Sequence, residues 1–292
     1  DANTIPIGLY SWKIDSRFGN VTFVPVDTLT HAFQNTNDTG GMTGQYNYLG
    51  NLGSPRLSRL FFDRRDASQF FFTDPYDLTV LRPEDIIFTN TLSPFTNLSY
   101  YKTFDSRNGE ERFKSYFAIN ANKRFGVGFY IDYLYGRGLY ASQSTAFFNG
   151  GLFASYRGDK YNMHFIFNND NLKMAENGGI ADDRYITNPL DMAEGKKEYK
   201  SYDIPTNLNK VWNHNTSYHV FMTQRYNLGF HKEKTDSVTK DSVRIIQEFV
   251  PVTSFIHTLQ VDLNGRKYIS YDDEQNQKYF EHNYLGNDSI DK

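Results

Sequence analysis

The side chains best suited to metal binding or proton transfer in this chain are its seven histidines. They are His31, His164, His214, His219, His231, His257 and His282. None belongs to an H-E-x-x-H motif, which places two zinc ligands and a general base on one face of a helix. His214 and His219 differ by an odd offset, so in an extended strand their side chains point to opposite faces. We therefore predict no metal and no cofactor, and we expect these histidines to occupy ordinary polar positions.

Nucleophilic catalysis is a second chemistry to consider, because Ser155 and His164 lie on neighbouring candidate strands. A hydrolase also needs an acid or amide partner on the same face, and "FASYR" has no recognisable nucleophile signature. The stretches "GVGFYI" and "GRGLYA" look like fragments of a dinucleotide-binding loop, but no helix follows either one. We predict that the protein is not an enzyme.

Three loop motifs have simple structural explanations. The "RGD" at 157–159 falls in a hairpin turn, where Gly-Asp is favourable turn chemistry. The acidic residues at 272–274 and the "NNDN" at 168–171 lack the ligand spacing of an EF-hand, so solvated loop charge explains them.

The elements that carry these residues are strands, as "FGVGFYIDYLY" at 125–135 shows. Its odd positions are aromatic or aliphatic: Phe125, Val127, Phe129, Ile131, Tyr133 and Tyr135. Its even positions are small or mixed: Gly126, Gly128, Tyr130, Asp132 and Leu134. This period of two is that of a β-strand. At about 3.3 Å per residue and a tilt near 40°, such a stretch rises roughly 28 Å, close to the apolar band of an outer-membrane barrel.

From residue 96 onward the sequence contains a succession of long strand candidates. They cover 96–104, 111–121, 125–135, 149–157, 161–169, 216–229, 243–262 and 266–271. Short hairpin turns are predicted at "NANKR", at "YRGDKY" and at "LNGRK", where Asn264 and Gly265 form the strongest hairpin signal. A long polar stretch occupies 170–215, and "KKEYKSY" at 196–202 is its best candidate for one further strand.

Composition supports a barrel with an apolar outside and a wet inside. The chain has 292 residues, including 25 Phe, 22 Tyr and 2 Trp, yet its mean hydropathy is -0.63. A net charge of -3 without a basic stripe excludes a nucleic-acid partner. The absence of cysteine excludes disulfides and thiolate metal sites. No apolar run is long enough for a membrane helix, and "DANTIP" does not resemble a signal peptide.

The fold predicted from these patterns is all-β, an antiparallel transmembrane β-barrel of outer-membrane type with long polar loops. Residues 1–95 form an irregular N-terminal segment with short strands. One arrangement of the fold places part of this segment inside the barrel. Residues 96–292 supply the barrel strands and loops, and the polar end "YLGNDSIDK" suggests that the barrel is incomplete at its C-terminus.

Strand parity then assigns side chains to the two faces, because Lys or Arg on the lipid face near the midplane costs about 2 to 4 kcal/mol. The predicted pore lining is Arg112, Lys114, Tyr116, Asp132, Asn162, His164, His219 and Arg225. The predicted lipid-facing girdle is Phe113, Phe117, Phe125, Phe129, Tyr133, Tyr135, Phe165 and Phe167.

Several longer motifs resemble the putative porin family of the Bacteroidota outer membrane. They include "SWKIDSRFGN", "DTLTHAFQN", "YLGNLGSP", "NTLSPFTNLSYYKT", "ENGGIADDRYITNPLDM", "RYNLGFHKE" and "FVPVTSFIHT". The resemblance covers about residues 10–285 and implies a barrel in the cell outer membrane with a passive-channel role. Members of that family are longer, so the chain resembles the N-terminal part of such a barrel. The family fixes no substrate motif, so no site residue is taken from it.

Function is therefore expected to be diffusion of small polar solutes through a hydrated lumen within outer-membrane lipid. The alternative is a plugged barrel that serves as a structural or partner-binding component among other envelope proteins. A soluble glycan-binding sandwich would explain the aromatic residues but not strands of this length. A conductance measurement distinguishes the open channel from the plugged barrel, and solubility of the native protein without detergent would favour the glycan-binding sandwich.

One modification is also predicted, because "DTL", "DSV" and "DSI" are similar to the O-glycosylation signal of Bacteroidota envelope proteins. Ser237 and Ser242 are the candidate acceptors. An intact mass equal to that of the bare polypeptide would remove this hypothesis.

Overall fold

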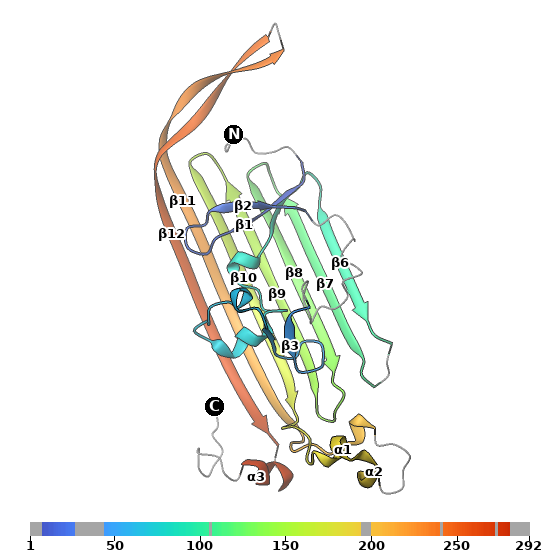
Figure 1. Cartoon of the computed structure of the whole chain (residues 1–292). Helices are drawn as coiled ribbons and strands as arrows, with labels where there is room; N and C mark the ends of the chain where they lie inside the picture. The colour runs from blue at the N-terminus through green and yellow to red at the C-terminus, as the bar shows by residue number, and fades with distance from the viewer. Residues whose placement is uncertain are drawn as a thin grey trace.

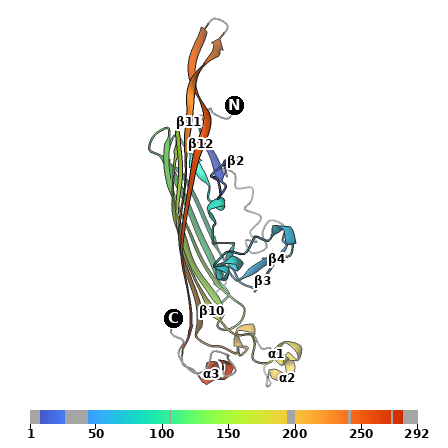
Figure 2. The same ribbon diagram turned by 90° about the vertical axis from the view of Figure 1, so that its left-hand side faces the viewer.

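The computed structural model describes residues 8–26, 44–104, 107–193, 200–239, 242–271 and 274–280, with only the backbone of 234–239, 242–246, 274–275 and 277. A large antiparallel sheet forms the body, and the N-terminal segment lies across one of its faces (Figures 1 and 2). This confirms the all-β, antiparallel prediction. Within the described ranges, no helix has the length and apolar character needed to cross a membrane, a finding that says nothing of β-barrels.

Seven strands form the large sheet in the order β12-β11-β10-β9-β8-β7-β6, so each strand pairs with its neighbours along the chain. The strands are β6 (Phe95–Lys102), β7 (Glu110–Asn120), β8 (Phe125–Arg137), β9 (Ser144–Arg157), β10 (Tyr161–Glu176), β11 (Val211–Thr239) and β12 (Ser242–Ser270). Among the described residues, β6 and β12 each have a strand neighbour on one side only. The described residues therefore form an open sheet and not a closed barrel, because its two edge strands do not pair with each other.

Short and long connections alternate between the two ends of the sheet. Residues 121–124 and 158–160 make tight turns at one end, where the β11–β12 hairpin also lies (Figure 1). Residues 103–109, 138–143 and 177–210 connect strands at the other end. Outer-membrane barrels show the same alternation of short turns and longer loops.

The hairpin predicted at "LNGRK" is wrong, and the strands predicted on either side of it are one strand. Asn264 pairs with Ser217 and Gly265 pairs with Thr216 within the continuous β12. β11 is correspondingly longer than predicted, and the two strands extend past β10 as a separate ribbon (Figure 1). The local turn preference of Asn-Gly is overridden because β11 offers backbone partners on both sides of this pair.

The polar stretch at 170–215 also differs from the prediction, because β10 continues to Glu176 and β11 begins at Val211. Between them lie the short helices α1 (Arg184–Thr187) and α2 (Pro189–Met192) and the 3-10 helix η5 (Ser201–Asp203). The strand proposed at 196–202 is wrong for its described part, where Ser201 and Tyr202 belong to η5; residues 196–199 lie outside the described residues. Because β12 continues through 264–265 without a turn, the alternation of the connections between the two ends of the sheet needs no additional strand within 170–215.

The described part of the N-terminal segment contains two small sheets and three 3-10 helices, and α3 (Glu274–Phe280) follows β12. The first sheet has the order β2-β1-β5, and the second is the β3-β4 hairpin. Their bounds are β1 (Tyr10–Ile14), β2 (Val21–Val24), β3 (Tyr46–Tyr48), β4 (Arg56–Ser58) and β5 (Phe88–Asn90). The 3-10 helices are η2 (Phe61–Asp63), η3 (Phe71–Tyr76) and η4 (Pro83–Asp85).

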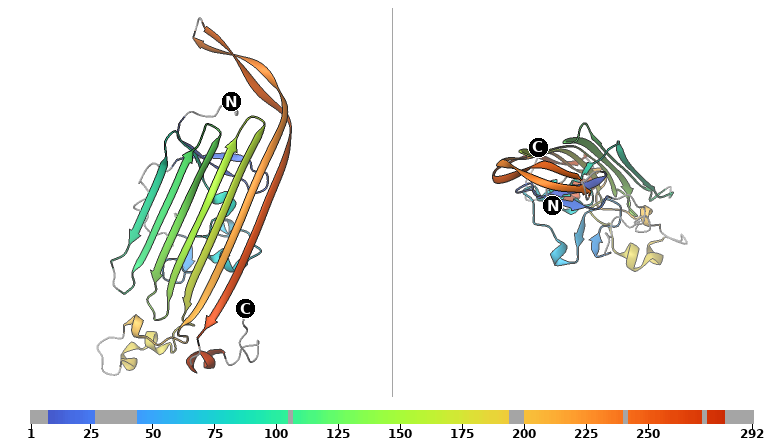
Figure 3. Two further views of the ribbon diagram at one scale, coloured as in Figure 1. Left: turned by 180° about the vertical axis from the view of Figure 1, so that it is seen from behind. Right: turned by 90° about the horizontal axis from the view of Figure 1, so that it is seen from above.

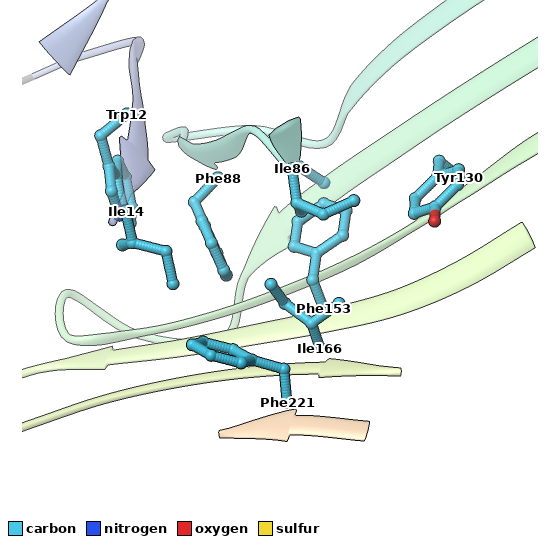
Figure 4. Close-up of a cluster of buried hydrophobic side chains, with 9 residues drawn as sticks. Trp12, Ile14, Ile86, Phe88, Tyr130, Phe153, Ile166 and Phe221 are labelled. Carbon is cyan, nitrogen blue, oxygen red and sulfur yellow. The ribbon is translucent and has the colours of Figure 1, made fainter. Parts of the chain in front are cut away.

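Two buried hydrophobic clusters join this segment to the large sheet. In the first, Trp12, Ile14, Ile86 and Phe88 of the segment meet strand residues that include Phe153, Ile166 and Phe221 (Figure 4). In the second, Leu52 and Tyr76 meet Leu134, Phe147, Leu172 and Met174. The burial pattern of β8 alternates strictly, with its even positions covered by the segment and its odd positions more exposed. The sheet therefore has an inward face, which carries the segment, and an outward face, which Figure 3 shows from behind.

Candidate functional site

A row of polar side chains crosses the inward face at mid-height, between the two hydrophobic clusters. Its members are directly opposite one another on adjacent strands: Lys114, Asp132, Asn149, Asp170, Ser217 and Asn264. Opposed residues in an antiparallel sheet share a face, so one polar position per strand produces a continuous row. We refer to these six residues as the polar row.

A buried ion pair lies near one end of the polar row. Arg112 on β7 donates from Nε to Oδ1 of Asp132 at 2.9 Å and from Nη2 to Oδ2 at 2.6 Å. Arg112 Nη2 also donates to the carbonyl oxygen of Leu78 in the N-terminal segment at 3.1 Å. The two side chains are 3% and 13% exposed, so their charges depend on each other for compensation.

Asp170 is the centre of the row and is surrounded by polar groups from four elements. In the orientation that satisfies its amide, Asn149 donates to Asp170 Oδ1 at 3.2 Å and accepts from Thr79 Oγ1 at 3.3 Å. His219 Nε2 lies 3.4 Å from Asp170 Oδ2, and His219 Nδ1 lies 2.7 Å from Asp262 Oδ1. The imidazole therefore bridges two carboxylates at the point where β10, β11 and β12 meet.

Several buried polar atoms beside the row have no hydrogen-bond partner among the described protein atoms. They are the Tyr130 hydroxyl, Asn168 Oδ1, Asp170 Oδ2, both amide atoms of Asn215 and the Ser217 hydroxyl. Buried polar groups in folded proteins are almost always hydrogen-bonded to protein or to ordered water. These atoms are therefore expected to bind water or a polar solute.

A cavity of about 560 Å³ lies between the N-terminal segment and the inward face of β11 and β12. The sheet contributes His219, Phe221, Gln260, Asp262 and Asn264 to its lining. The segment contributes three carboxylates, Asp74, Asp77 and Glu84, and two guanidinium groups, Arg65 and Arg82. The walls of this cavity thus combine charged side chains of both signs with apolar ones such as Phe70 and Phe221, in contrast to the two hydrophobic clusters.

A second cavity, of about 460 Å³, lies within the N-terminal segment and shares Arg65, Asp74, Asp77 and Arg82 with the first. Ion pairs cross this shared wall: Arg56 to Asp77 at 2.5 Å and Arg82 to Asp74 at 3.6 Å. Arg65 binds Asp85 through two hydrogen bonds of 2.7 and 3.1 Å. The charges around both cavities are therefore largely arranged as pairs.

All eight residues predicted to line a pore lie on the inward face. Arg112 and His164 are buried beneath the segment rather than open to a lumen, since His164 accepts a hydrogen bond from Trp12 Nε1 at 3.1 Å. Arg225 donates to the carbonyl oxygen of Phe18 and to Asn20 Oδ1, so it also contacts the segment. His219 is the predicted residue that lines the larger cavity.

The predicted lipid-facing residues lie on the opposite, outward face. Phe117 and Phe129 stack there with ring centroids 5.3 Å apart. Phe129 and Tyr133 are exposed, whereas the even positions between them are buried. Ser237 and Ser242 lie near the tip of the β11–β12 ribbon, and their side chains are outside the described residues.

Sequence reasoning missed Asn149, Asp170 and Thr79. Asn149 was at the predicted start of its strand, and Asp170 was one residue beyond the predicted end of the next. Continuing the two-residue period through both strands would have placed them on the inward face. No local signal could have found Thr79, because its contact with Asn149 depends on how the segment docks. Across the described residues, no three His, Cys, Asp or Glu side chains are placed to hold a metal ion.

Comparison with known proteins gives one match. A sequence model of the family described as Putative porin matches residues 8–292. A search of curated proteins and a search of solved structures each found no match.

Proposed function

Because the chain belongs to the putative porin family, we propose that it forms part of an outer-membrane β-barrel through which small polar solutes diffuse. The observation that carries this proposal is the two-sided sheet. Its outward face presents aromatic and aliphatic side chains, while its inward face carries the polar row and a cavity whose lining includes charged side chains. A membrane-spanning barrel with a hydrated interior requires this division.

The proposed passage runs between the N-terminal segment and the inward face of β11 and β12. The larger cavity lies there, and the unpaired polar atoms beside the polar row favour water in the same region. Solutes would be selected by the width of the passage and by its lining charges. The proposed function involves no covalent chemistry and no cofactor, and its partners are membrane lipid and the solute.

Narrowing this passage is expected to reduce conductance. Asn264→Trp adds a large ring to the cavity lining, so single-channel conductance of the full-length protein in a planar bilayer should fall to roughly half or less. Val261→Trp is the matched control, because Val261 opposes Val220 on the outward face. Equal conductance of Asn264→Trp and wild type would contradict this path.

The second candidate function is a plugged barrel that binds other envelope proteins. It is favoured by the close attachment of the N-terminal segment, which includes both hydrophobic clusters and hydrogen bonds such as Thr145 Oγ1 to the Leu52 carbonyl oxygen at 2.6 Å. If the protein inserts into a bilayer but shows no conductance, the partner-binding function would be supported and the channel function contradicted.

The outward face gives a direct test of membrane insertion. Phe129→Arg should destabilise the inserted sheet by about 2 to 4 kcal/mol, because it places a charge near the middle of the apolar band. Tyr135→Arg, near the end of the same strand, should cost only about 0 to 1 kcal/mol. Equilibrium unfolding in lipid vesicles measures both. Equal losses would show that this face does not contact the bilayer core.

Glycosylation of Ser237 or Ser242 remains a proposal of the same kind. Their position near the tip of the ribbon keeps them away from the proposed membrane band. The intact mass of the native protein tests it.

A further inference from the structure

Three basic residues lie side by side on the outward face, at the end of the sheet near the long connection 177–210. Lys173 on β10 opposes His214 on β11, and His214 opposes Lys267 on β12. The side chains of both lysines are exposed on this face. The three side chains therefore form one contiguous group, which we call the basic triplet.

The triplet is unusual because no described carboxylate compensates the charges of its two lysines. Lys173 and Lys267 both oppose His214, so their like charges lie at the same level of the sheet, one strand apart from each other across β11, and repel each other. On the inward side, Arg112 and Arg65 each bind a carboxylate. Within the part of the chain that the structure describes, no carboxylate lies in ion-pair range of Lys173 or Lys267. An anion from outside the protein would remove the repulsion.

Neighbouring groups hold two members of the triplet in place. The Lys173 ammonium lies 4.4 Å from the ring centroid of Trp212. The His214 Nε2 donates to Asn171 Oδ1 at 2.9 Å, which fixes the imidazole ring between the two lysines. An aromatic ring beside cationic side chains is typical of the boundary between a bilayer and water.

The triplet lies at one edge of the apolar band. Moving along β12 from Lys267, the outward residues Gly265, Leu263, Val261 and Leu259 have no polar side chain, and polar character returns at His257. On β10 the same face has Asn171 and Asn169 before its apolar residues begin. At about 3.3 Å per residue and a tilt near 40°, the distance from Lys267 to His257 corresponds to a rise of roughly 25 Å. This is the height of the apolar band in outer-membrane barrels, so the triplet would lie at the depth of lipid headgroups.

We propose that Lys173, His214 and Lys267 form a binding site for the phosphate group of an anionic lipid headgroup. The inference rests on the proposed insertion of the sheet into a membrane. The two ammonium groups supply the charge and donate hydrogen bonds to the phosphate oxygens, the His214 ring lies between them, and Trp212 lies beside the headgroup. Binding of the lipid would compensate the charges that the sheet brings together.

Native mass spectrometry of the full-length protein tests this site after reconstitution in vesicles of phosphatidylcholine containing phosphatidylglycerol. Wild type should retain phosphatidylglycerol. Lys173→Gln and Lys267→Gln should each weaken its retention about fivefold, and the double variant about 25-fold, since each surface lysine has a comparable effect on anionic lipid binding. The double arginine variant, which keeps both charges, should retain the lipid.

Lys102→Gln is the matched control, because Lys102 also lies on the outward face but has Glu111 3.9 Å away. Removing the charge of Lys102 should leave the retention of phosphatidylglycerol unchanged. Retention by the double glutamine variant at the wild-type level would overturn the proposal. So would displacement of the lipid by millimolar inorganic phosphate, which would identify a site for free phosphate instead. Failure of wild type to float with vesicles would contradict the proposed membrane function, whereas inserted protein without lipid preference would contradict only this site.

Discussion

Asp132→Ala is expected to destabilise the folded protein by about 3 to 5 kcal/mol, because it leaves a buried guanidinium without its carboxylate. Arg112 is almost completely buried and donates a hydrogen bond to the Leu78 carbonyl oxygen of the N-terminal segment. Equilibrium unfolding by urea in lipid vesicles, followed by tryptophan fluorescence, measures the change. The expected loss is large because the charge on Arg112 cannot be removed by deprotonation in a protein.

An exposed ion pair provides the control for this experiment. Arg124 and Asp159 lie at the turn end of the sheet, 2.9 Å apart, with side chains 51% and 61% exposed. Asp159→Ala should therefore cost at most about 1 kcal/mol. A double variant with Arg112→Met and Asp132→Leu should recover most of the lost stability, since a buried apolar pair needs no compensation. If Asp132→Ala cost no more than Asp159→Ala, the pair would not be buried in the folded protein.

Phe88→Ala is expected to have the second large effect, a loss of about 3 to 5 kcal/mol that falls on the docking of the N-terminal segment. Phe88 is 1% exposed and stacks on Trp12 at 5.9 Å. It also meets Phe153 and His164 of the sheet, at 5.6 and 4.9 Å between centroids. Removing its ring leaves a cavity between the segment and the strands. The seven-stranded sheet should persist while the segment becomes weakly attached.

Limited proteolysis and conductance detect that separation. Cleavage within the segment should become faster in Phe88→Ala, and the proposed passage should widen, which raises the single-channel conductance. Phe62→Ala is the matched control, because Phe62 is 96% exposed and its removal leaves no buried cavity. Protection of the segment at the wild-type level would show that the first hydrophobic cluster does not hold it in place.

The sequence by itself determined the two faces of the central strands. Successive side chains of an extended chain point to opposite sides for covalent reasons, whatever their surroundings. The glycines at 126 and 128, together with Asp132, therefore had to share one face, and Phe125, Phe129 and Tyr133 the other. The structure has this assignment in β8 and in its neighbours. Turns such as 121–124 were equally predictable, because their backbone geometry depends on a few adjacent residues.

Only the tertiary structure decided where the strands end and what covers the inward face. The continuation of β12 through Asn264 and Gly265 depends on hydrogen bonds to a strand distant in sequence, and these outweigh a local turn preference. The polar row requires the register of six strands at once. The contacts of Trp12, Leu52 and Thr79 with the sheet join residues separated by long stretches of chain, whose spatial arrangement no local pattern encodes. The two-residue period of a strand determines on which face of the sheet a side chain lies, whereas tertiary packing determines which other residues it contacts.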